Sequence, residues 1–243
     1  MFNKKEIFSL IIALIILTFV FGFNDKSEVF VFTNWLSHFL YVFFVVLIVL
    51  FVKELGHKVF ALWRDCDVKF EIWSIKSLWF SKASEFKNRF RIGLWLPIFG
   101  TILTNGWLPL TFVGEHKIKG NKLLRTGGVW VKVSDYERNL ICFGGFVFLG
   151  LFLIILNVLS RKIGMDIDLF VRVIFFVMLF NYLPFHRLDG AYIFFGGRFV
   201  YIFGLVFLIL CYLLFFVSFW LFVILGGLIG LILIGIIFYN WTK

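Results

Sequence analysis

Long apolar runs alternate with short polar segments along this chain. A run of about 20 apolar residues is long enough for a helix to cross a bilayer. Such runs predict an all-α polytopic membrane protein. Seven runs are candidates: Ile7–Phe23, Val29–Val52, Ile92–Val113, Asn139–Leu159, Leu169–Phe185, Phe199–Val217 and Phe219–Tyr239.

The third run differs from the others because it contains five residues that interrupt helices: Pro97, Gly100, Asn105, Gly106 and Pro109. A straight helix facing lipid could not keep its backbone hydrogen bonds with so many interruptions. We therefore expect a broken or re-entrant segment here, and about six transmembrane helices in the chain.

Composition supports a membrane protein. Hydrophobic residues make up 62% of the 243 positions, and the mean hydropathy is +1.00. The formal net charge is +10, but the basic residues lie between apolar runs, which favours the positive-inside rule over nucleic-acid binding.

Two polar motifs stand at the ends of apolar runs. The first is Lys53-Glu54-Leu55-Gly56-His57, and the second runs from Asn181 to Gly190 as NYLPFHRLDG. Ionisable groups at membrane depth are costly and are kept for a partner or a task. The two motifs therefore mark the candidate site.

The charge distribution is consistent with a topology that unites these motifs. If the third run turns back, both motifs face the cytoplasm, and the segment from Lys58 to Arg138 holds 14 of the 24 Lys and Arg residues on that side. We expect a multi-pass integral membrane protein with both termini cytoplasmic.

Short strands are expected between the second and fourth runs. Apolar and polar residues alternate over Val68–Trp73 and again over Val129–Val133. This pattern predicts a small β element at the membrane surface. Its edge could alternatively receive an unwound substrate segment by strand addition.

The first motif reads as HExxH with Lys53 at the leading histidine position. Residues one helical turn apart face the same way, so HExxH offers two imidazoles to one zinc ion beside a glutamate. Here only Glu54 and His57 retain that chemistry. An ammonium at Lys53 repels a divalent cation unless burial neutralises it.

The second motif predicts an aspartate at an interrupted helix end. Pro184 cannot continue a helix, Asn181 can satisfy backbone groups freed there, and Gly190 permits a tight turn beside Asp189. A carboxylate placed in this way can complete a metal site or pair with a cation.

Together, Glu54-Leu55-Gly56-His57 and the later Asn181, Pro184 and Leu188-Asp189-Gly190 resemble the site-2 protease family of intramembrane zinc metalloproteases. The segment from His57 to Trp73 is similar to archaeal members. The resemblance covers residues 29–190, a core that follows an N-terminal helix in 1–28 and precedes a C-terminal hairpin in 191–243. It implies the plasma membrane of an archaeon.

The resemblance also implies residue roles. His57 and Asp189 would bind zinc, Glu54 would be the catalytic general base, and the substrate would be a transmembrane protein cut within the bilayer. Lys53 departs from the pattern at a ligand position, and Gly144-Gly145-Phe146 departs from the small-Gly-Pro pattern of the intervening span. His186 could supply the missing ligand, or it could be a polar residue at the membrane interface.

Three functional classes follow. The first is a metallopeptidase homologue with impaired or absent zinc-dependent hydrolysis. The second is an inactive protein that binds transmembrane helices, with the Lys53 ammonium pairing Glu54 or Asp189 in place of zinc. The third is a transporter, disfavoured because the sequence shows no repeated half. His38 and His116 are expected to be structural or solvated, and the oligomeric state is open.

Overall fold

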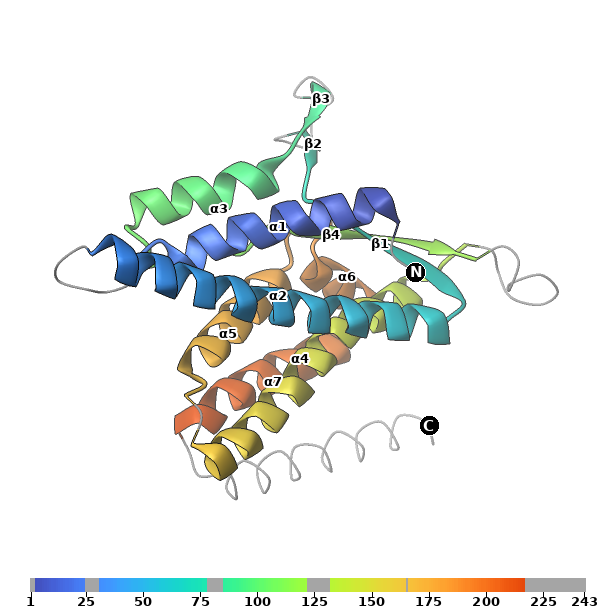
Figure 1. Ribbon diagram of the computed structural model, residues 1–243. Coiled ribbons are helices and arrows are strands. Elements are labelled where there is room, and N and C mark those ends of the chain that lie inside the picture. The colour runs from blue at the N-terminus through green and yellow to red at the C-terminus, as the bar shows by residue number, and fades with distance from the viewer. Residues whose placement is uncertain (1–2, 25–30, 78–84, 122–131, 165, 217–243) are drawn as a thin grey trace.

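The computed structural model describes residues 3–24, 31–77, 85–121, 132–164 and 166–216. Within these residues the molecule is mostly helical, with seven helices and four short strands (Figure 1). The run predicted at Phe219–Tyr239 lies outside the described residues.

Three of the described helices are long and apolar enough to cross a membrane: α1 (Lys4–Gly22), α2 (Phe32–Trp63) and α4 (Asp135–Ile163). They coincide with three of the predicted runs. The later helices are α5 (Asp168–Tyr182), α6 (Asp189–Gly196) and α7 (Arg198–Phe216). Three of the predicted spans thus have a helix of suitable length and composition. The other predicted spans stay predictions, and so do the domain boundaries at residues 28 and 190.

The third run folds as the short helix α3 (Ile92–Leu103) followed by a turn and an extended return. Asn105 and Gly106 make the turn with positive φ angles of 49° and 74°. Both ends of the segment then meet at Trp73. Its carbonyl accepts from the Gly93 N–H at 3.1 Å, and its N–H donates to the Val113 carbonyl at 2.9 Å. The broken, returning course is therefore observed, whereas its depth in a bilayer stays a prediction.

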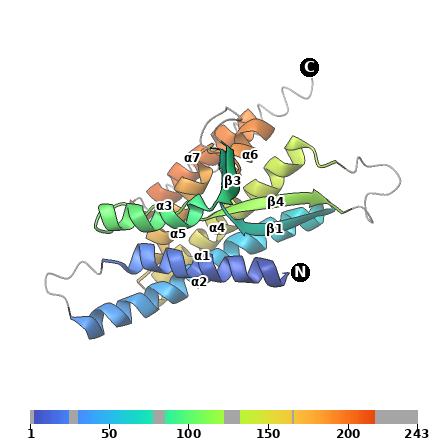
Figure 2. The same cartoon turned by 90° about the horizontal axis from the view of Figure 1, so that it is seen from above.

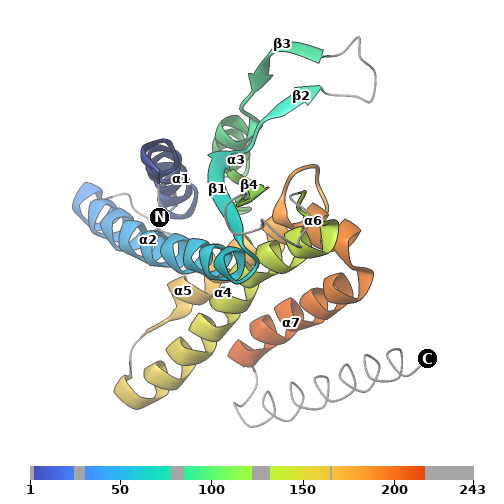
Figure 3. The ribbon, with the colours of Figure 1, turned by 90° about the vertical axis from the view of Figure 1, so that its right-hand side faces the viewer.

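Four strands form two small antiparallel pairs. Strand β1 (Cys66–Ile72) pairs with β4 (Gly114–Gly120), and β2 (Ile75–Ser77) pairs with β3 (Glu85–Phe90) in a hairpin that projects from the helices (Figures 1 and 3). The strand predicted at Val68–Trp73 is confirmed as β1. Most of Val129–Val133 lies outside the described residues, and the observed partner, β4, was not predicted.

Helix α1 runs alongside the β1–β4 sheet (Figure 2) and is fixed there by a buried carboxylate. Glu6 Oε1 accepts from the Phe70 N–H at 3.2 Å and from Lys58 Nζ at 2.7 Å. Lys58 Nζ also donates to the Val68 carbonyl at 2.6 Å. The side chains of Glu6 and Lys58 thus hydrogen-bond to backbone groups on the edge of β1 that does not face β4. The alternative hypothesis of strand addition is thus restricted on this edge, which is covered at Val68 and Phe70.

Candidate functional site

Helix α2 continues eleven residues beyond Val52, so the first motif lies inside the helix and not at its end. Lys53, Glu54 and His57 are each at most 3% exposed. His57 Nδ1 lies 2.8 Å from the Lys53 carbonyl oxygen. Because a carbonyl can only accept, Nδ1 carries the proton, and the lone pair of His57 is on Nε2.

Glycines allow α4 to pack closely over this turn of α2. A Cβ at Gly56 would collide with the Gly144 carbonyl, and a Cβ at Gly145 would collide with the imidazole ring of His57. The Gly144-Gly145 pair, which departs from the pattern of the resembled family, therefore serves here to seat α4 against His57. Any larger residue at 145 must displace that ring.

Asp189 reaches the site through a broken helix, as predicted. Helix α5 ends at Tyr182, the chain turns through Pro184, and α6 begins at Asp189. Gly190 has no room for a Cβ because the Tyr182 carbonyl lies against it. Asn181 differs from expectation: its Nδ2 donates to the Val177 carbonyl at 2.8 Å, one turn earlier in α5, and does not cap the break.

The two motifs meet through a buried ion pair. Lys53 Nζ lies 3.1 Å from Asp189 Oδ2, with the side chains 3% and 1% exposed. The same carboxylate oxygen lies 3.4 Å from His57 Nε2, which has no hydrogen-bond partner among the described residues. Of the two partners expected for Lys53, the structure therefore selects Asp189.

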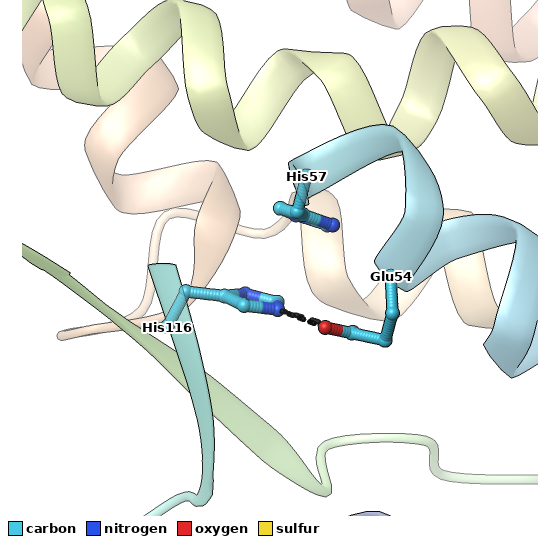
Figure 4. Close-up of side chains that lie close together, drawn as sticks. All are labelled: Glu54, His57 and His116. Atoms are coloured by element: carbon cyan, nitrogen blue, oxygen red, sulfur yellow. Dashed lines mark hydrogen bonds and ion pairs between the residues drawn. The ribbon is translucent and has the colours of Figure 1, made fainter. Parts of the chain in front are cut away.

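His116 is part of the site: of the two expectations for it, the structure excludes the solvated one, because the side chain is buried and paired. It projects from the inner face of β4, opposite Phe70 of β1, and is 1% exposed. Its Nδ1 lies 2.6 Å from Asp189 Oδ1, and its Nε2 lies 3.1 Å from both oxygens of Glu54. Its ring stacks on His57 with centroids 3.9 Å apart, and Figure 4 shows the three side chains together.

These contacts bridge the two carboxylates with one imidazole. Burial alone would lower the pKa of His116, but Asp189 and Glu54 raise it to about 9. Burial would likewise raise the pKa of Asp189, but His116 and Lys53 hold it well below its usual range. His116 is therefore an imidazolium at neutral pH, and each of its N–H groups donates to a carboxylate.

His186 does not join this cluster. Its side chain is exposed, and its backbone carbonyl accepts from Trp73 Nε1 at 3.0 Å. Of the residues expected to bind zinc, the structure thus brings together His57 and Asp189, with His186 outside. One signal in the sequence could have pointed to His116, namely its position beside the broken segment, but it has no fixed spacing to either motif.

The donor set fits a metal ion in part. Tetrahedral zinc with bonds of roughly 2.0–2.1 Å places its ligand atoms about 3.3–3.4 Å apart, which matches the 3.4 Å between His57 Nε2 and Asp189 Oδ2. However, Lys53 Nζ lies against that same oxygen. A second possible group is Glu54, His57 and His116, whose ligand atoms all lie within 4.8 Å of one another.

A small apolar groove between α1 and α2 lies beside this cluster. It has a volume of about 170 Å³, and Glu54 is its one ionisable lining residue. The rest of its lining is aliphatic or aromatic: Ile7, Leu10, Ile11, Leu14, Leu47, Leu50 and Phe51. The groove thus offers an apolar surface between two helices that are long enough to span a membrane, while the Glu54 side chain stays buried behind it.

Comparison with known proteins gives one partial similarity. The chain is 32% identical over 109 residues to a Helicobacter pylori (strain J99) protein named "Putative zinc metalloprotease". The match covers 44% of this chain and 28% of that protein, so the chain spans well under half of the relative's length. No family model matches the chain, and no solved structure matches it. The similarity supports a resemblance to zinc metalloproteases.

Proposed function

We propose that this chain is a site-2-protease-like membrane protein that binds transmembrane segments of other proteins, with peptide hydrolysis impaired or absent. The observation that carries the proposal is the buried pair of Lys53 Nζ and Asp189 Oδ2 at 3.1 Å. An ammonium cannot donate a lone pair to zinc, and here it lies against the carboxylate that would be a ligand.

The charges in the cluster support a site that needs no metal. Lys53 and the His116 imidazolium contribute two positive charges, and Glu54 and Asp189 contribute two negative charges. Buried charges persist where they are paired and hydrogen-bonded. The four groups balance one another, and a divalent ion would leave an excess of positive charge unless both Lys53 and His116 lost their protons.

The apolar groove between α1 and α2 supports a helical client. Its almost wholly apolar lining suits the side chains of a transmembrane segment. In this scheme Glu54 and Asp189 stay paired with His116 and Lys53 inside the protein, and the bound segment is not cleaved.

A second candidate function, zinc-dependent peptide hydrolysis with a changed ligand set, is favoured by the Glu54–His57–His116 group. Nδ1 of His57 contacts the Lys53 carbonyl oxygen, and Nδ1 of His116 contacts the Asp189 carboxylate. Contacts of this kind at Nδ1 orient the Nε2 atom of each ring toward a metal ion. Two histidines with one carboxylate are a known set of zinc ligands. Zinc held there would polarise a peptide carbonyl and acidify a water molecule. Asp189 and Lys53 would then orient the ligands.

Reconstitution with a model client tests the proposal. The full chain is placed in proteoliposomes with a fluorescent apolar helix of about 20 residues. Energy transfer measures binding, and mass spectrometry measures cleavage. We expect binding without cleavage in wild type and in Glu54→Gln, with weaker binding when Leu47 and Phe51 are changed to Trp to fill the groove. Cleavage by wild type that is lost in Glu54→Gln would favour the second candidate.

A further inference from the structure

A second, larger cavity lies on the opposite face of the β1–β4 sheet from His116. Its volume is about 940 Å³, and it is bounded by the first turns of α1, by the outer face of the sheet and by the start of α3. Six cationic side chains line it: Lys4, Lys5, Lys69, Arg91, Lys117 and Lys119.

The acidic side chains in the lining do not neutralise these cations. Three carboxylates are present, and two of them are engaged: Glu6 with Lys58, and Glu71 with Lys117. Within the described part of the chain, Lys69 and Lys119 have no carboxylate within ion-pair distance. The cavity therefore carries an excess of three positive charges.

The sheet register adds an independent sign of an anionic ligand. Lys69 of β1 lies directly opposite Lys117 of β4, so two ammonium groups share one face of adjacent strands. On the same face Lys117 also pairs with Glu71, and Asp67 lies opposite Lys119. Like charges directly opposite each other destabilise a sheet. An anion bound between the strands and α1 would remove that repulsion.

An apolar stripe on α1 continues from the cavity along the helix. Phe8 and Ile12 line the cavity, and Ile15 follows on the same face at helical spacing. Phe8 is 64% exposed and Ile15 is 59% exposed. A ligand that fills the whole surface therefore has an anionic head and an extended apolar body.

We propose that this cavity binds the phosphate-bearing headgroup of an anionic phospholipid, with an acyl chain lying along Phe8, Ile12 and Ile15. Basic pockets beside membrane helices are suited to such headgroups. The proposal requires α1 to lie in a bilayer, which its length and hydropathy permit. An acidic peptide would satisfy the lysines but would leave the apolar stripe uncovered.

Native mass spectrometry of the full chain in detergent tests this proposal, with phosphatidylglycerol and phosphatidylcholine as the probes. The test variant is Lys69→Gln/Lys119→Gln. The control is Lys132→Gln/Lys162→Gln, which removes the same charge from exposed positions outside the cavity lining. Circular dichroism checks that helicity is unchanged in both variants.

Wild type should retain phosphatidylglycerol over phosphatidylcholine. In the test variant this preference should be roughly tenfold to thirtyfold smaller, since each surface cation contributes to the attraction of anionic lipid. The preference of the control variant should match that of wild type. Equal retention of the two lipids, or an equal loss in the control, would overturn the proposal. So would displacement of phosphatidylglycerol by inorganic phosphate or by a glutamate-rich peptide, which would identify a free anion or an acidic segment as the ligand.

Discussion

Lys53 Nζ and Asp189 Oδ2 lie 3.1 Å apart, joining residues that are 136 positions apart in sequence across the interface of α2 and α6. Lys53 places a positive charge at the position where the resembled metalloproteases carry a zinc ligand. Breaking the pair should therefore have a large and specific effect on stability.

Replacing Asp189 with Ala should strongly destabilise the protein, because Lys53 and His116 would both lose a buried counter-charge. Removing one partner of a buried pair costs about 3–5 kcal/mol. The measurement is reversible unfolding in mixed detergent micelles. The double variant Lys53→Met/Asp189→Leu should recover much of the loss, and a double variant as unstable as Asp189→Ala would contradict the pairing.

The protonation of His116 predicts a loss of stability at alkaline pH. The folded-state pKa is raised from 6.5 to about 9, so the stabilisation is fully present below pH 6.5 and is lost as the pH rises through 9. The thermal midpoint of the full chain should fall between pH 7 and pH 9.5.

The control for this profile is His116→Gln, which keeps a hydrogen-bonding side chain but cannot titrate. It should be less stable than wild type at pH 7 and should lose the part of the pH dependence that lies in this window. An identical slope in wild type and His116→Gln would show that another group titrates there.

Gly145→Ala should displace the His57 ring and destabilise the packing of α4 on α2. Added volume in a close-packed position typically costs about 1–3 kcal/mol. The loss should be non-additive with His57→Ala, which removes the colliding ring. Equal effects of Gly145→Ala in wild type and in the His57→Ala background would mean that the ring is not what the Cβ meets.

His186→Ala should leave both stability and metal content unchanged, because its side chain is exposed and lies outside the cluster. Surface substitutions of this kind usually stay within about 0.5 kcal/mol. His116→Gln is the matched comparison, since it removes the histidine that contacts Glu54 and Asp189. If a bound metal ion were lost in His186→Ala but kept in His116→Gln, the ligand set expected from the sequence, with His186 as a ligand, would be supported instead.

Local patterns predicted the three long helices, strand β1 and the broken course of Ile92–Val113, because each depends on residues close together in the chain. The meeting of Lys53 with Asp189 was one of two pairings expected, since burial demands a partner for each charge. These features follow from hydropathy, from helix-breaking residues and from the cost of unpaired charge.

The place of His116 could not be predicted in this way. Strand β4 reads GEHKIKG, which lacks the apolar alternation of a strand, and its pairing with β1 spans the whole broken segment. The register alone sets Phe70 opposite His116 and turns that imidazole inward. A one-residue shift would have placed it on the outer face. His186 is nearer to Asp189 in sequence, but the turn before α6 leaves it exposed.

The zinc content per chain of detergent-purified protein tests the central claim most directly, measured by elemental analysis in wild type, Lys53→His and His116→Gln. The account predicts almost no zinc in wild type and about one equivalent in Lys53→His, where an imidazole replaces the ammonium beside Asp189. About one equivalent in wild type, lost in His116→Gln, would contradict it and would indicate a metal centre built from Glu54, His57 and His116.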